Sequence, residues 1–273
     1  MRRQVAISFI LLLLCALPAS AGMYYEATTT VDNGQGSNQV KGWVDGEKSR
    51  VEFVASEMPQ VGAGSYLVTE DGGRTLFLVD PQEKTYSRYD LAAMMSVLES
   101  TGGLFEMQFS DPEVEVLDES DGGSLLGHST RYVKTRTRYD MTMKVMGMTR
   151  VMKTDSVQEM WLAQGLDQPG FFAWLRKGLR TTGDSGLDKV LSAEMDKVEG
   201  GVPLKSVVVS TTANQKGRGT ETRTVTEVTR IEETSIDGKI FRVPAEFTEV
   251  DLLSGAANDN EGGNPLRGLF GGG

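Results

Sequence analysis

Cysteine and histidine are almost absent from this chain of 273 residues, which contains one of each. Cys15 lies in an apolar run near the N-terminus, so residues 22–273 have no thiol that could form a disulfide. A chain of this length can bury a core without such crosslinks. His128 is the one imidazole available to a catalytic triad, and the carboxylates show no Ca²⁺-loop spacing. The sequence predicts no catalytic residue, no metal site and no cofactor.

Basic residues are also scarce. The chain has 28 lysines and arginines against 38 aspartates and glutamates, for a net charge of −10. Residues 1–21 hold two of the arginines and no acidic residue, so residues 22–273 carry −12. An acidic chain without a basic run is a poor partner for nucleic acid or for an anionic membrane surface. We therefore expect no nucleic-acid binding.

Long apolar runs are missing after residue 21, so we expect no transmembrane segment in the mature chain. The first 21 residues have the features of a signal peptide: Arg2 and Arg3, an apolar core at 7–17, and small residues at 19–21. The expected mature start is Gly22, and the expected location is the periplasm. Cys15 lacks the small preceding residues of a lipoprotein signal, so no lipid anchor is expected there.

Residues 64–90 are expected to form an antiparallel meander, and the rest of the chain is organised around it. Apolar runs at 66–68 and 76–79 flank Asp71-Gly72-Gly73, which supplies the positive φ angles of a tight hairpin. Further strands are expected at 23–31, 39–43, 48–55, 114–117, 203–213, 220–233 and 239–243. Residues 128–163 predict a long hairpin that turns near Gly147.

Three helices are expected between the strands. Asp90 is a suitable N-cap for a helix over 91–100, a second helix begins at Gln168-Pro169, and a weaker one covers 187–198. Asp184 and Ser185 copy part of a chymotrypsin-type serine motif, but they better suit a helix cap. Together the elements predict an α+β fold: a single strongly curved antiparallel sheet, an incomplete β-barrel, with helices covering the concave face.

The composition changes near the C-terminus, where residues 254–273 are rich in Gly and Asn and have little to bury. This predicts a disordered tail. The expected organisation is thus a signal peptide at 1–21, one domain at 22–252 and a tail at 253–273.

Several motifs carry a family resemblance. The run YLVTEDGGRTLFLVDPQEKTY, after KGWVDGEKSRVEF, resembles the LolA/LolB-like half-barrels of the lipoprotein-carrier superfamily. The order of four later motifs is similar to a secreted family of unknown function in the same superfamily. These motifs are the glycine-to-tyrosine stretch 127–132, Glu159-Met160-Trp161-Leu162, Gly201-Val202-Pro203-Leu204 and the aromatic–proline ending at 241–247.

The resemblance implies an incomplete barrel whose concave face is covered by helices. In the lipoprotein carriers that cavity holds acyl chains, so the resemblance implies a non-catalytic carrier for an apolar ligand. The candidate cavity and lid residues are Leu91, Met94, Met95, Leu98, Met141, Met143, Trp161, Phe171, Phe172, Trp174, Leu175 and Leu179. Arg50 is the candidate lid-closing residue, or it lies on the outer face.

Two other functions stay open. The chain could be a structural or interaction module of the cell envelope, with a filled core and a protein partner. The methionines at 141, 143, 146, 148 and 152 are soft ligands that suit Cu(I), although methionine is also an ordinary filler of apolar space.

Overall fold

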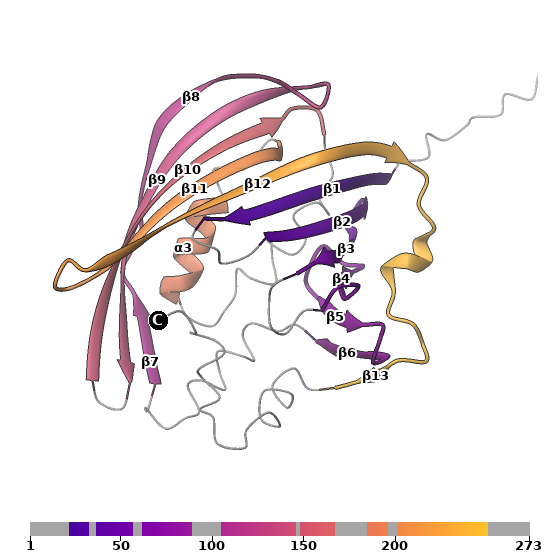
Figure 1. The fold of residues 1–273 in the computed structure, drawn as a ribbon, viewed down its shortest axis with the longest axis horizontal. Helices are drawn as coiled ribbons and strands as arrows, with labels where there is room; N and C mark the ends of the chain where they lie inside the picture. Colours follow the sequence, from indigo (N-terminus) through magenta and orange to yellow (C-terminus); the bar gives the residue numbers. More distant parts are fainter. Residues whose placement is uncertain are drawn as a thin grey trace, which may run out of the picture.

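The computed structural model describes residues 22–32, 37–56, 62–88, 105–145, 148–166, 185–195 and 201–250. Thirteen strands of these residues form one open sheet, and its longest strands curve along their length (Figure 1). The strand order is β13-β6-β5-β4-β3-β2-β1-β12-β11-β10-β9-β7, and β8 also pairs with β9. All pairs are antiparallel except β13 with β6.

The first half of the sheet follows the predicted meander. Thr69 and Asp71 organise the turn between β4 and β5, where the Thr69 hydroxyl donates to the Asp71 carboxylate at 2.9 Å. Gly72 and Gly73 have φ angles of 71° and 84°, as a tight turn requires. The strands are β1 (Gly22–Val31), β2 (Ser37–Asp45), β3 (Lys48–Ala55), β4 (Tyr66–Thr69), β5 (Phe77–Asp80) and β6 (Thr85–Arg88).

The second half consists of longer strands, apart from β7. The predicted hairpin is confirmed, since Met148 on β10 pairs with Val145 on β9. The strand expected at 114–117 extends to Leu125, and Asp121-Gly122-Gly123 lies inside it, beside an irregularity in the pairing with β9. The strands are β7 (Phe105–Phe109), β8 (Glu113–Leu125), β9 (His128–Val145), β10 (Met148–Ala163), β11 (Val202–Asn214) and β12 (Gly219–Thr234).

The predicted α+β class, with helices covering a concave face, is wrong. In the described ranges the one α-helix is α3 (Ser185–Met195), which is too short to cover the sheet. Each of the strands β8 to β12 is 13 to 18 residues long, so strands dominate the described residues. The predicted helix at 187–198 corresponds to α3, and those at 91–100 and after Gln168 lie outside the described residues. No helix in the described part of the chain is long and apolar enough to cross a bilayer.

The segment after β12 folds back over strands β2 to β6. The strand expected at 239–243 is instead a 3-10 helix, η3 (Gly238–Phe241), because the Asp237 side chain accepts a hydrogen bond from the Lys239 amide at 3.0 Å. Phe241 is 1% exposed and packs with Tyr66, Val68 and Val79. The segment ends in β13 (Thr248–Glu249), which pairs with β6.

A second buried cluster lies between β1, β2, β3 and the ends of the long strands. It contains Met23, Tyr25, Ala27, Val44, Val51, Ala163, Val202, Leu204 and Val228. The sheet is therefore held by apolar packing at both its short-strand and long-strand parts.

Candidate functional site

The two faces of β9 differ sharply in chemistry. Val133, Thr135 and Thr137 are 2%, 3% and 5% exposed, and we call the face that bears them the inner face. Alternate residues on the opposite, outer face are Lys134, Arg136 and Arg138. The register between β9 and β10 has no irregularity, so each face continues directly onto β10. This alternation assigns each residue of the two strands to either the inner or the outer face.

Between Arg150, which lies opposite Met143, and Arg131, which lies opposite Leu162, the inner face of these two strands carries no charged residue. The inner-face positions of β9 between 133 and 143 are Val133, Thr135, Thr137, Tyr139, Met141 and Met143. Those of β10 between 152 and 160 are Met152, Thr154, Ser156, Gln158 and Met160. The surface is thus built from thioether, aliphatic, aromatic, amide and hydroxyl groups.

Met141 lies directly opposite Met152, and Met143 is the next residue along the same face. All three side chains are partly buried. Phe109 of β7 pairs with Met141 from the other side, and its ring centroid lies 6.1 Å from that of Tyr139. We call Met141, Met143 and Met152 the methionine face. Its side chains are flexible and polarisable.

The inner face becomes fully buried toward the other end of the two strands. Val133, Met160 and Leu162 form an apolar cluster there and are at most 2% exposed. Between this cluster and the methionine face, the Gln158 amide donates to the Ser206 hydroxyl at 3.4 Å. Along the two strands the inner face therefore changes from a fully buried apolar cluster at one end to the partly exposed methionine face at the other.

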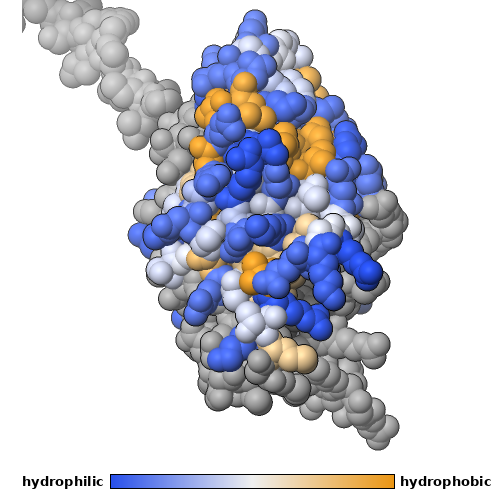
Figure 2. Space-filling model, turned by 90° about the vertical axis from the view of Figure 1, so that its left-hand side faces the viewer, coloured by the Kyte–Doolittle hydropathy of each residue, from blue (hydrophilic) through white to orange (hydrophobic). Residues whose placement is uncertain are grey.

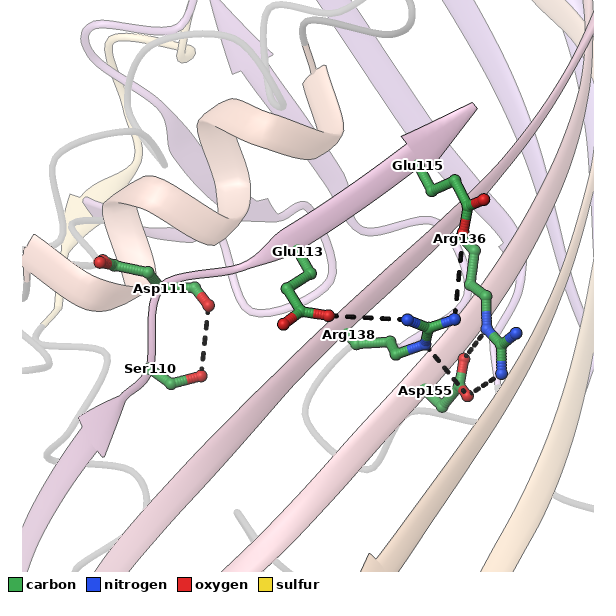
Figure 3. Close-up of polar contacts among 7 residues, drawn as sticks. All are labelled: Ser110, Asp111, Glu113, Glu115, Arg136, Arg138 and Asp155. Atoms are coloured by element: carbon green, nitrogen blue, oxygen red, sulfur yellow. Dashed lines mark hydrogen bonds and ion pairs between the residues drawn. The ribbon is translucent and has the colours of Figure 1, made fainter. Parts of the chain in front are cut away.

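The outer face carries paired charges instead (Figure 3). Arg138 lies 3.6 Å from Glu113, 3.9 Å from Glu115 and 3.7 Å from Asp155. Arg136 donates to both oxygens of Asp155, and these hydrogen bonds hold the pKa of the Asp155 carboxyl below its usual range. A surface of mutually neutralised, hydrated charges does not suit an apolar ligand.

Trp161 lies on the outer face, away from the methionines. It pairs with Tyr132, and their ring centroids are 5.0 Å apart. The Lys205 ammonium lies 5.5 Å from the Trp161 ring centroid. The structure thus groups Met141 and Met143 but separates Trp161 from them. Sequence reasoning could not assign these faces because the register across the Gly147 turn was not fixed.

Arg50 lies on the face of β3 opposite the buried residues Val51 and Phe53. Its guanidinium carbon is 3.6 Å from the centroid of the Tyr66 ring. It also donates to the Glu52 carboxylate at 3.0 Å and to the backbone oxygen of Ile240 at 3.4 Å. Arg50 therefore attaches η3 to β3 and β4.

The other candidate lid residues lie outside the described residues. They are Leu91, Met94, Met95, Leu98, Phe171, Phe172, Trp174, Leu175 and Leu179. Among the residues that are described, no group of three or more His, Cys, Asp or Glu side chains could hold a metal ion.

The family model of a domain of unknown function, DUF4412, matches residues 134–247, from β9 to the segment after η3. The match covers less than half of the chain, so it agrees with the expected resemblance to a family of unknown function but does not assign the chain to that family. No curated protein matches the chain.

Three solved structures are similar to the chain at low identity. PNGF-II has 12% identity and a TM-score of 0.37 over 86% of this chain, which spans only 32% of that chain's length. A Vibrio parahaemolyticus structure, described as an outer membrane lipoprotein-sorting protein domain, has 10% identity and a TM-score of 0.30, with 82% and 91% of the two chains covered. A DUF1329 family protein from Desulfovibrio piger has 11% identity and a TM-score of 0.29, with 82% of this chain and 91% of that chain covered. At these TM-scores the likeness carries no inference about ligand, activity or partner.

Proposed function

We propose that the protein is a non-catalytic, periplasmic binding protein that holds an apolar ligand, a lipid or a lipoprotein acyl chain, against the methionine face. The observation that carries this proposal is the grouping of Met141, Met143 and Met152 on the inner face, where they are partly rather than fully buried. One charged residue, Arg150, borders this group opposite Met143. Flexible thioether side chains adapt to apolar ligands of varied shape.

The contrast between the two sheet faces supports the same function. Burial of apolar surface contributes roughly 25 cal/mol per Å², so an acyl chain gains most where no charge must be desolvated. The inner face meets this condition over residues 133–143 of β9 and 152–160 of β10. The outer face, with Arg136, Arg138 and Asp155, does not. Thioether and aliphatic groups do not exchange protons, so the proposed role is binding without catalysis.

The proposed location follows from the N-terminal sequence. The basic start, the apolar core at 7–17 and the small residues at 19–21 are typical of a cleaved signal peptide. The mature protein is expected to begin at Gly22 and to be released with the periplasmic fraction. N-terminal sequencing that found residues 1–21 retained would contradict this location.

Native mass spectrometry of the protein, purified from the envelope of the cells that make it, tests the function. We expect a bound species with the mass of a lipid, released by mild activation in the gas phase. A protein that carries no lipid, and that takes up none from mixed phospholipid vesicles, would contradict the proposal. That result would favour the alternative of a structural module with a filled core.

A further inference from the structure

Strand β8 (Glu113–Leu125) is an edge of the sheet over most of its length. Within the described residues it pairs with β9 alone, and residues 115–121 are all exposed. Alternate residues of an edge strand direct their backbone N–H and C=O groups away from the sheet, where another strand can bind them. The β8 edge is therefore open to an added strand.

Two aliphatic side chains lie at the centre of this edge. The pairing with β9 shifts between Val116 and Asp118, so Leu117 is an extra residue that bulges out of the strand. Val116 is 46% exposed and Leu117 is 42% exposed. On the side of the molecule where β8 and β9 lie, Figure 2 shows apolar patches within a largely hydrophilic surface.

Carboxylates flank the two aliphatic residues on both sides, and the stretch 113–121 has no basic residue. The acidic residues are Glu113, Glu115, Asp118, Glu119 and Asp121. Arg138 lies near Glu113 and Glu115, and Arg131 bonds Glu119 at 2.9 Å, all from the β9 side. Lys134 and Arg136 also lie opposite Asp118 and Glu115, but they form ion pairs with Glu159 and Asp155 of β10. The five carboxylates of β8 therefore outnumber the cations that bond them, and the edge stays negative.

We propose that the outer edge of β8 pairs with an extended, basic segment of a partner protein. The backbone groups of β8 would bind the segment as an added strand, which is a common mode of peptide recognition. Val116 and Leu117 would contact apolar residues at the segment's centre, and lysines or arginines on both sides would face the carboxylates. A second copy of this chain does not fit, because two acidic β8 edges repel each other.

This inference is independent of the proposed ligand site. Val116 pairs with Thr135 and so lies on the inner face, but no β8 residue belongs to the methionine face. A partner strand would bind the backbone of the β8 edge, whereas an apolar ligand would bind the methionine side chains. The carboxylates and the bulge also protect the edge against self-association. The carboxylates in addition select for a partner of opposite charge.

The test uses a fluorescein-labelled probe peptide, acetyl-Lys-Thr-Lys-Val-Ile-Val-Lys-Thr-Lys-amide, and measures its affinity for the full protein by anisotropy. We expect saturable binding below about 1 mM that weakens as salt is added, since opposite charges are screened. Hydrogen exchange should slow in 113–121 when the peptide binds. The control peptide has the same sequence with alternate backbone amides N-methylated, which removes strand pairing but keeps the charges.

Two exposed strand positions provide matched protein variants. Leu117→Ser should weaken peptide binding about tenfold, because burying a leucine contributes roughly 1.5–3 kcal/mol. Val54→Ser, at a site on β3 with 40% exposure, should leave binding unchanged. Any of three results overturns the proposal: no saturable binding by about 1 mM, equal binding of the N-methylated peptide, or equal effects of the two variants.

Discussion

Gly42 of β2 lies directly across from Tyr25 of β1, and the tyrosine ring covers the glycine. A Cβ atom at position 42 would lie 2.0 Å from both Cε1 and Cζ of that ring. Tyr25 is 5% exposed, and its burial raises the pKa of the phenol above the usual range. A glycine in a strand interior is thus explained by a packing contact with its cross-strand neighbour.

Gly42→Ala should destabilise the protein by about 1–3 kcal/mol, because the buried ring must move to admit the methyl group. Urea unfolding measures this change. Gly62→Ala is the control, since its added Cβ would meet only the Ser65 hydroxyl at 3.9 Å. Equal unfolding midpoints for the two variants would contradict the packing account.

Local signals in the sequence predicted much of the sheet. Asp71-Gly72-Gly73 identified the hairpin, and β3 (Lys48–Ala55) has the predicted bounds, because turn chemistry and two-residue alternation act within a few residues. At 239–243 the same reasoning failed. The apolar residues there pack on the sheet through a capped 3-10 turn, which two-residue alternation cannot distinguish from a strand.

The candidate site was less predictable because it depends on contacts between distant residues. Met141 and Met143 were selected as a pair, but their position opposite Met152 follows from the register of β9 with β10. The same register places Trp161 on the outer face, although its apolar character suggested a cavity. The separation of Arg50 from Ile240 by 190 positions explains why its contact with η3 was not foreseen.

Arg50→Ala should destabilise the protein by about 1–2 kcal/mol, since it removes the stacking on Tyr66 and the hydrogen bond to Ile240. Limited proteolysis should then cut the segment 235–250 faster. Arg74→Ala removes a more exposed pair with Glu47, at 3.7 Å, and should change stability little. Comparable losses in both variants would show that Arg50 does not attach η3.

Stability should depend on pH through Asp155. Hydrogen bonds from Arg136 lower the pKa of Asp155 in the folded state, so its stabilising contribution is present above the usual aspartate value of about 3.9. That contribution is lost as the pH falls through the folded-state pKa. Asp155→Asn should therefore reduce the loss of stability in acid, as measured by urea unfolding between about pH 5 and pH 2. An unchanged pH profile would exclude this role.

The proposed function also makes a prediction about Cu(I). If the methionine face receives an apolar ligand, the chain should not retain Cu(I) in competition with bathocuproine disulfonate. The direct pairing of Met141 with Met152 makes this a necessary test, because thioethers are soft ligands that suit Cu(I). Tight one-to-one binding that disappears in Met141→Leu/Met143→Leu would replace the apolar-ligand proposal with a copper site.

Binding of a pyrene-labelled fatty acid to two neighbouring variants tests the central claim most directly. Met141 and Thr142 are adjacent on β9, are both partly buried, and lie on opposite faces of the sheet. Met141→Glu should weaken binding by about tenfold or more, since a carboxylate opposite Met152 on the inner face must be desolvated by the ligand. Thr142→Glu should leave the affinity unchanged, with unfolding of both variants measured in parallel. Equal affinities of the two variants, or no binding to the unmodified protein, would contradict the account.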